Sequence, residues 1–259
     1  MKKEIRIFFT ALMYFTRIPC PKWVDHSEEY LNKSSRYFPV VGIIVGSISS
    51  FAYWIFQFIL PQEIAIILSI IASVLATGAF HEDGFADVCD GFGGGWTKEK
   101  ILLIMKDSRL GTYGVIGLGL ILLLKWSLLS HMPAGVLIAA LISGHAISRL
   151  NAVSLIYTDQ YARDDDSSKS KPLATKMSAG SLVFAIISGL APLFLFADPY
   201  VFLTILPLLF TRWYFSGYFK KWIGGYTGDC LGAVQQVSEV IFYISLLIIF
   251  KYAGSWKFI

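Results

Sequence analysis

Residues 40–60 read VVGIIVGSISSFAYWIFQFIL, an uncharged apolar run long enough to cross a bilayer, for which about 20 residues are needed. Six further apolar runs follow it. The second, third, fifth and seventh runs are short or carry polar residues, so their edges are less sharply marked. The sequence therefore predicts an all-α, polytopic integral membrane protein with about seven transmembrane helices. The predicted spans are Val40–Leu60, Ile64–Phe80, Val115–Leu129, Gly135–Leu155, Ser181–Ala197, Tyr200–Phe219 and Val234–Phe250.

The composition supports a bilayer as the solvent. Hydrophobic residues make up 55% of the 259 residues and charged residues 15%, with a mean hydropathy of +0.61, whereas about a quarter of a soluble domain is charged. The three cysteines are scattered, which favours neither a disulfide framework nor a zinc site. Because no internal repeat or low-complexity linker occurs, we expect residues 1–259 to form a single membrane-embedded catalytic domain.

The segment Ile5–Ile18 is apolar but contains Arg6 and Arg17. Apolar and charged residues in one helix favour a position along the membrane interface over a span. The segment also lacks the small-residue cleavage site of a signal peptide. We therefore predict an N-terminal amphipathic interfacial helix.

The positive charges predict the orientation of the chain. The N-terminal region, 81–114, 156–180 and 220–233 hold seven, four, four and two Lys or Arg residues, and the alternate loops hold none. The positive-inside rule places the charged loops in the cytoplasm of a bacterial inner membrane. Lys125, Arg149 and Arg212 fall within predicted spans, and the two arginines lie close enough to the inner ends to snorkel there.

The segment HEDGFADVCDG at residues 81–91 follows the second predicted span and carries the candidate chemistry. Read as a helix, it places Asp83, Asp87 and Asp90 at i, i+4 and i+7, on one narrow face that we call the acidic stripe. Gly84 and Gly91 lie beside the stripe and would let a backbone or a nucleotide approach closely.

The three aspartates repel one another unless a cation neutralises them. Hard carboxylate oxygens suit Mg²⁺ or Mn²⁺, with phosphate oxygens completing the coordination. This favours metal-assisted phosphoryl transfer at a membrane boundary, where ionisable residues are usually functional. The alternative is a solvated acidic helix end.

Two neighbouring motifs predict phosphate contacts. The run Gly93–Gly95 precedes a predicted helix Thr97–Lys106 with Thr97 as its N-cap, and Gly94 is the candidate that would cradle a phosphate. Lys106 and Arg109 stand one helical turn apart and could share a phosphate, while Asp107 could be a ligand or a base. The alternatives are a flexible turn and a basic flank that follows the positive-inside rule.

Further cytoplasmic candidates for substrate binding lie in three regions. Thr227, Asp229 and Gln236 belong to the last loop and the helix it enters, and polar residues there carry a desolvation cost that binding would explain. A small-residue packing face with polar contacts is the alternative. Arg17 could meet an anionic substrate or a lipid phosphate, and Lys171 could contact a phosphate.

Five blocks of this sequence resemble those of the cobalamin synthase family, the adenosylcobinamide-GDP ribazoletransferases. The most diagnostic are HEDGFADVCDGFGGG at 81–95 and MKDSRLGTYG at 105–114. FTRIP at 15–19, YFPVVG at 37–42 and GGYTGDCLGA at 224–233 resemble the other blocks in the expected order. The resemblance covers essentially the whole chain.

The resemblance implies a Mg²⁺-dependent membrane enzyme of the final step of cobalamin synthesis. It would join adenosylcobinamide-GDP to α-ribazole or its 5′-phosphate and release GMP. By position, the metal site would be Glu82, Asp83, Asp87 and Asp90. We expect Asp90 to accept the hydroxyl proton because it lies farthest from the span. The implied partners are both substrates, the bilayer, and either further copies of the chain or other enzymes of the pathway, but not nucleic acid.

Three other functions compete with this one. A CDP-alcohol phosphatidyltransferase also places spaced aspartates at a helix end, but in a different order. An intramembrane prenyltransferase would normally carry two acidic clusters. A cation-coupled transporter would hold its carboxylates near the bilayer midplane, in two related halves.

Overall fold

The computed structural model describes residues 2–24, 27–162 and 176–253, which are helical apart from loops and one isolated bridge between Tyr161 and Tyr226. The predicted all-α fold is thereby confirmed for the described residues. Short 3₁₀ turns occur at Ser35–Tyr37, Ala191–Leu195 and Pro199–Thr204. The helices are α1 (Lys2–Phe15), α2 (Glu28–Ser34), α3 (Phe38–Phe56), α4 (Gln62–Thr77), α5 (Phe80–Gly94), α6 (Lys98–Ile104), α7 (Thr112–Ser130), α8 (Ala134–Thr158), α9 (Ala179–Leu190), α10 (Ile205–Ile223) and α11 (Gly228–Ala253).

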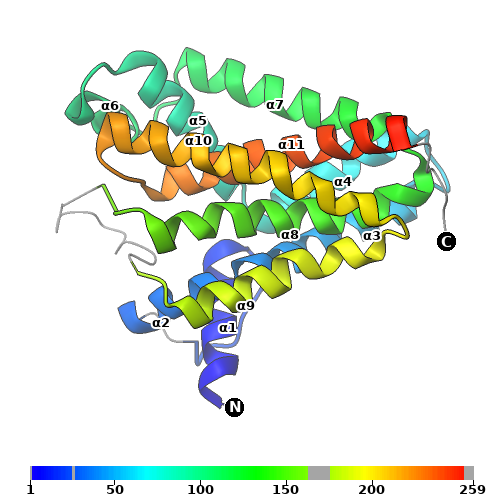
Figure 1. The fold of residues 1–259 in the computed structure, drawn as a ribbon, viewed down its shortest axis with the longest axis horizontal. Helices are drawn as coiled ribbons and strands as arrows, with labels where there is room; N and C mark the ends of the chain where they lie inside the picture. The colour runs from blue at the N-terminus through cyan, green and yellow to red at the C-terminus, as the bar shows by residue number, and fades with distance from the viewer. Residues whose placement is uncertain (1, 25–26, 163–175, 254–259) are drawn as a thin grey trace.

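The long helices form an elongated bundle with its loops at two ends (Figure 1). At one end the backbone N–H of Ala162 donates to Tyr226 O at 2.9 Å. At the opposite end Gln62 Nε2 donates to Met132 O at 2.9 Å. Helices α5 and α6 lie at the first of these ends, so the described parts of 81–114, 156–180 and 220–233 gather there (Figure 1).

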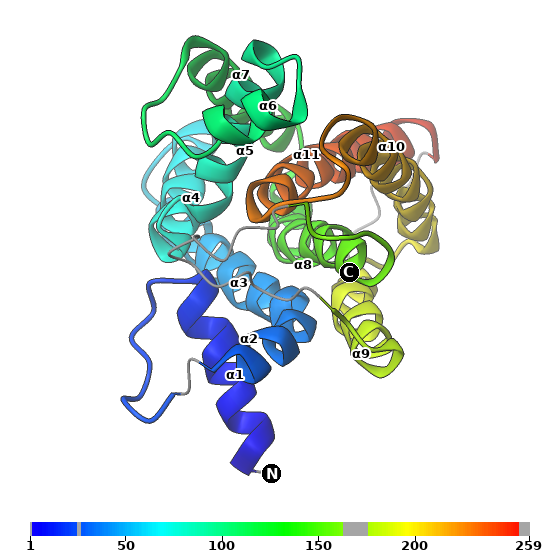
Figure 2. The ribbon, with the colours of Figure 1, turned by 90° about the vertical axis from the view of Figure 1, so that its left-hand side faces the viewer.

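Helix α8 forms the centre of the bundle, surrounded by α3, α9, α10 and α11 (Figure 2). Its apolar residues lie on every side, which is typical of a buried helix. Helix α3 approaches α8 closely through Gly42 and Gly46, which are spaced four residues apart. A Cβ at residue 46 would lie 2.7 Å from the Cα of Ile142, and one at residue 42 would lie 2.9 Å from the Cα of Ala146. Small residues at this spacing allow membrane helices to pack tightly.

The outer surface of the bundle is apolar. Large exposed side chains line α7, α9 and α10, whereas a soluble monomer rarely exposes such a contiguous patch. A hydrocarbon environment accounts for this surface. Examples are Leu120, Leu123, Ile187, Leu206, Phe210 and Trp213, all at least 56% exposed.

Four helical stretches of the described chain are long and apolar enough to cross a membrane: Glu29–Phe56, Thr112–Ser130, Ala134–Thr158 and Gly228–Tyr252. A fifth crossing is reached only if the bent pair of α4 and α5 counts as one span. Each of the seven predicted spans overlaps a helix. The count of seven is not confirmed, because Ala179–Leu195 is short and α10 carries Arg212, Lys220 and Lys221.

Helix α1 lies at a steep angle to the long helices and projects from the side of the bundle (Figures 1 and 2). Ile7, Ala11 and Phe15 are buried against the bundle, while residues 3–6 are exposed. A charged, exposed first turn followed by a buried apolar face is the amphipathic pattern predicted for an interfacial helix.

Candidate active site

The site begins at a sharp bend between α4 and α5. The two helices meet at 89°, with Gly78 (φ 66°) and Ala79 (φ 59°) in left-handed conformations. Glycine adopts this conformation without strain, whereas alanine does so at a cost. The acidic segment thus follows the second predicted span, and the bend turns α5 across the end of the bundle.

Arg17 lies over this bend. Its backbone N–H donates to Ala76 O at 2.8 Å, and a Cβ at residue 78 would lie 2.9 Å from the arginine Cδ. The Arg17 side chain is exposed and has no hydrogen-bond or ion-pair partner among the described residues. Its charge thus stands beside the first turn of α5, where an anionic substrate could meet it.

Helix α5 crosses the first turns of α11 at very close range. A Cβ at residue 84 would lie 3.0 Å from the Cα of Asp229, and one at residue 232 would lie 3.2 Å from His81 O. Gln236 Nε2 donates to Glu82 Oε1 at 2.9 Å in the same contact. The predicted close approach at Gly84 is confirmed, with the α11 backbone as the partner, and Asp229 and Gln236 share the face predicted for them.

The three members of the acidic stripe lie on one helix, as predicted, but in different surroundings. Asp83 is exposed and has no hydrogen-bond or ion-pair partner among the described residues. Asp87 is half-buried and Asp90 is buried. Side chains at i and i+4 are neighbours on a helix surface, so Asp83 and Asp87 present adjacent carboxylates at the end of the bundle.

Asp90 holds the start of α7. Its Oδ2 accepts a hydrogen bond from Gly111 N–H at 2.7 Å and its Oδ1 accepts one from Gly114 N–H at 2.8 Å. These amides belong to the N-terminal turn of α7, where unpaired N–H groups and the helix dipole favour an anion. Both oxygens of the carboxylate predicted to act as the base are therefore already engaged.

We expect Asp90→Asn to destabilise the protein by about 1–3 kcal/mol, because its NH₂ group would face an N–H that now has a charged acceptor. The measurement is the midpoint of unfolding in detergent. Asp83→Asn is the matched control and should leave that midpoint unchanged. Equal midpoints for Asp90→Asn and wild type would contradict this role.

The glycine run is not the phosphate-cradling loop that was predicted. Gly93 and Gly94 are the last residues of α5, and Gly95 N–H donates to Gly91 O at 2.9 Å. An amide inside a helix already donates to the residue four earlier, so Gly94 has no spare N–H. Thr97 does cap α6, accepting a hydrogen bond from Lys100 N–H at 3.3 Å.

Helix α6 ends at Ile104, two residues earlier than predicted. Lys106 and Arg109 therefore lie in a loop and not one helical turn apart. Arg109 pairs with Asp107 at 2.6 Å, and its hydrogen bonds lower the pKa of Asp107 to about 2. A carboxylate that weakly basic is a poor proton acceptor near neutral pH, so the pair is better suited to binding than to proton transfer.

The last cytoplasmic loop is tied to the end of α8. Tyr226 N–H donates to Gln160 O at 3.0 Å. Thr227 is fully buried and caps α11, accepting a hydrogen bond from Cys230 N–H at 3.3 Å. Thr227 therefore has a structural role in this structure. The candidate Lys171 lies outside the described residues.

Sequence reasoning missed a buried charge cluster in the centre of the bundle. Lys125 Nζ of α7 lies 2.6 Å from Glu239 Oε1 of α11, and both side chains are at most 2% exposed. Tyr243 donates to the same carboxylate at 2.9 Å. Arg149 of α8 is 1% exposed and donates to His145 O at 2.9 Å. We call Lys125, His145, Arg149, Glu239 and Tyr243 the buried charge cluster.

The prediction that Arg149 snorkels to the interface is wrong. Its guanidinium carbon lies 5.6 Å from the ring centre of Phe38, inside the bundle. The side chain of Arg212, in contrast, reaches Ser154 and Thr158 at the end of α8. The sequence did contain a signal for the buried charge cluster. Several of its charged residues lie inside apolar runs, and such residues usually face the interior of a membrane protein.

Hydrogen bonds connect the buried charge cluster to the acidic helix. Gln235 Nε2 donates to Glu239 Oε2 at 2.9 Å, and Gln236 Nε2 donates both to Gln235 Oε1 at 3.0 Å and to Glu82 Oε1 at 2.9 Å. Glu82 Oε2 is buried without a partner in the described chain. Glu82 is thus turned into the bundle, away from the exposed face where Asp83 stands.

The chain is similar to known proteins along nearly its whole length. The family model of cobalamin-5-phosphate synthases matches residues 7–247. The adenosylcobinamide-GDP ribazoletransferase of Shewanella frigidimarina is 51% identical over 251 residues, 95% of each chain. Proteins of the same name are 48% identical over 259 residues in Shewanella piezotolerans, 98% of each chain, and 47% identical over 253 residues in Shewanella oneidensis, 95% of each chain. No solved structure matches the chain.

Proposed function

The chain belongs to the cobalamin-5-phosphate synthase family, and we propose that it transfers the phosphocobinamide group of adenosylcobinamide-GDP to α-ribazole or its 5′-phosphate. The 3′-hydroxyl of the ribose attacks the phosphorus that carries cobinamide, the bond from that phosphorus to GMP breaks, and GMP leaves. The names of the relatives support the substrate and the reaction class. The single structural observation that supports the chemistry is the adjacent pair of carboxylates, exposed Asp83 and half-buried Asp87, on a helix turned across the end of the bundle.

We further propose that Asp83 and Asp87 hold Mg²⁺. Mg²⁺ is commonly bound through one or two carboxylates together with water and substrate phosphate. The described residues contain no group of three or more His, Cys, Asp or Glu side chains placed to enclose a metal, so the proposal assigns two carboxylates to the ion and leaves the remaining positions to water and substrate. When bound, the ion would neutralise charge on the phosphate oxygens and polarise the phosphorus.

The other acidic residues of the family motif have supporting roles. Asp90 holds the N-terminus of α7 in place through both of its oxygens, and these two N–H donors occupy about half of the lone pairs through which its carboxylate could bind an ion or a proton. Glu82 bonds to Gln236 and fixes α5 against α11. Asp83 has no hydrogen-bond or ion-pair partner among the described residues, so one of its carboxylate oxygens can bind the ion while the other takes the hydroxyl proton.

Basic residues near α5 would bind the anionic substrates. Arg17 stands at the start of α5, and Arg109 lies in the loop that leads to α7, 88% exposed at its side chain. Positioning and charge neutralisation account for most of the catalysis in phosphoryl transfer. Following the positive-inside rule, we place these residues on the cytoplasmic side of a bacterial inner membrane.

The test is product formation by the purified full chain in lipid vesicles. With adenosylcobinamide-GDP, α-ribazole and Mg²⁺, we expect equal amounts of GMP and cobalamin by chromatography, and neither product when Mg²⁺ is removed with a chelator. Turnover that is unaffected by the chelator would refute the metal site while leaving the transferase activity standing. Transfer from a CDP-alcohol instead would favour the phosphatidyltransferase alternative.

A further inference from the structure

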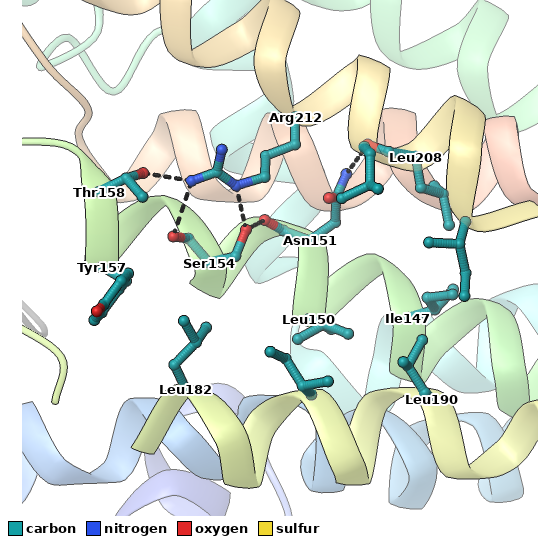
Figure 3. A pocket seen from close by; sticks show the side chains of 13 residues that line it. Ile147, Leu150, Asn151, Ser154, Tyr157, Thr158, Leu182, Leu190, Leu208 and Arg212 are labelled. Atoms are coloured by element: carbon teal, nitrogen blue, oxygen red, sulfur yellow. Dashed lines mark hydrogen bonds between the residues drawn. The ribbon is translucent and has the colours of Figure 1, made fainter. Parts of the chain in front are cut away.

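A groove lies between α8, α9 and α10 (Figure 3). Its volume is about 520 Å³, within the range of roughly 300–1,000 Å³ typical of small-molecule sites. No residue of α5, α6 or α7 lines it. Leu182 and Leu190 of α9 face Leu150 and Ile147 of α8 across the opening, so most of the groove is apolar (Figure 3).

One end of the groove is polar and positively charged. Arg212 of α10 donates from Nε to Ser154 Oγ at 2.8 Å and from Nη2 to Ser154 O at 3.4 Å, and it also bonds to Thr158 Oγ1. These three acceptors are neutral. The neighbouring carboxylate, Asp159, instead accepts a hydrogen bond from Ser216 at 2.9 Å.

The charge of Arg212 therefore has no counterion in the described chain. Every ion pair found within 4.0 Å among the described residues involves other groups. Its Nη1 also has no hydrogen-bond partner there. A cation at the edge of an apolar groove, with one donor group unused, is suited to bind an anion such as phosphate.

The length of the groove is close to the hydrocarbon thickness of one bilayer leaflet. Its lining on α8 runs from Ile147 to Thr158, which corresponds to about 16 Å at 1.5 Å per residue. Half of a hydrocarbon core is about 15 Å thick. The groove also opens to the outer surface, because Tyr157, Ile186 and Leu209 line it yet remain 46%, 39% and 54% exposed.

We propose that this groove binds one phospholipid, with its phosphate on Arg212 and an acyl chain between α9 and α10. The charged end of the groove matches the phosphate of a phospholipid, and its apolar part matches an acyl chain. In a leaflet the phosphate lies at the surface and the chain lies below it, in the same order as in the groove. The lipid would fill the space between α9 and α10 and connect both helices to α8. This site is independent of the proposed transferase activity.

Binding to the delipidated full chain in detergent, measured by native mass spectrometry, tests the proposal without any substrate. Phosphatidylglycerol should bind at one site, while diacylglycerol, which lacks the phosphate, and glycerol 3-phosphate, which lacks the chains, should bind about tenfold more weakly or worse. Arg212→Gln should weaken phosphatidylglycerol binding about tenfold, since a charge-assisted contact is lost, and Arg212→Lys should restore part of it. Lys221→Gln removes an exposed charge from the same helix and should have no effect on this site.

A second variant tests the apolar part. Leu150→Trp should fill the groove and reduce phosphatidylglycerol binding while Arg212 is intact. Equal binding of diacylglycerol and phosphatidylglycerol, or unchanged binding by Arg212→Gln, would overturn the proposal. Tight binding of glycerol 3-phosphate alone would also overturn it and would assign Arg212 to a soluble phosphate compound. An unchanged unfolding midpoint in each variant shows that lost binding is not lost folding.

Discussion

Asp87→Asn protein in lipid vesicles, supplied with both substrates and Mg²⁺, should release GMP on the order of 10²-fold more slowly than wild type. The substitution removes a negatively charged ligand while keeping the size of the side chain. Interactions that stabilise developing charge in a transition state typically contribute this much to kcat. The initial rate of GMP formation across a range of Mg²⁺ concentrations is the measurement, and the Mg²⁺ requirement should rise.

Two comparisons separate a metal ligand from a structural residue. Glu99→Gln removes an exposed carboxylate from α6, close in sequence but outside the acidic stripe, and should retain wild-type turnover. Asp87→Cys should recover activity when Mn²⁺ replaces Mg²⁺, because a softer ion accepts a thiolate more readily. Full turnover by Asp87→Asn at the wild-type Mg²⁺ requirement would remove Asp87 from the proposed site.

Glu239→Gln should destabilise the fold by about 3–5 kcal/mol, a larger loss than the one expected for Asp90→Asn. Glu239 is the carboxylate that Lys125 contacts at 2.6 Å, and the two side chains are 1% and 2% exposed. Removing one partner of a buried pair leaves the other charge without compensation in a medium that solvates it poorly. Since native stability is commonly about 5–15 kcal/mol, much of the protein should unfold under mild denaturant.

The unfolding free energy in detergent, from a denaturant titration, measures this effect. Glu63→Gln changes an exposed carboxylate at the end of the bundle away from the acidic helix. It should shift the unfolding free energy by less than about 0.5 kcal/mol. The double variant Lys125→Met/Glu239→Gln should recover part of the loss, because no buried charge of the pair then remains. A loss below about 1 kcal/mol for Glu239→Gln would mean that water or another charge compensates Lys125.

The acidic stripe was predictable from the sequence because it depends only on local helical structure. The spacing of Asp83, Asp87 and Asp90 required only that residues 81–91 be helical, and α5 is helical over that segment. Helical periodicity defines which residues share a face. It does not define what that face meets, and for this reason the hydrogen bonds of Asp90 to the amides of Gly111 and Gly114 were not predicted.

The sequence by itself determined the helices, the membrane class, the acidic stripe and the family, because apolar run length, helical periodicity and sequence motifs are local properties of the chain. Only the tertiary structure decided the 89° bend at Gly78 and Ala79, the burial of Arg149 and Glu239, and the groove ending at Arg212. Each of these depends on which helices pack together. A charged side chain within an apolar run can either reach the membrane interface or pair with another charge inside the bundle. Which of these two arrangements has the lower free energy depends on the helices that pack beside it.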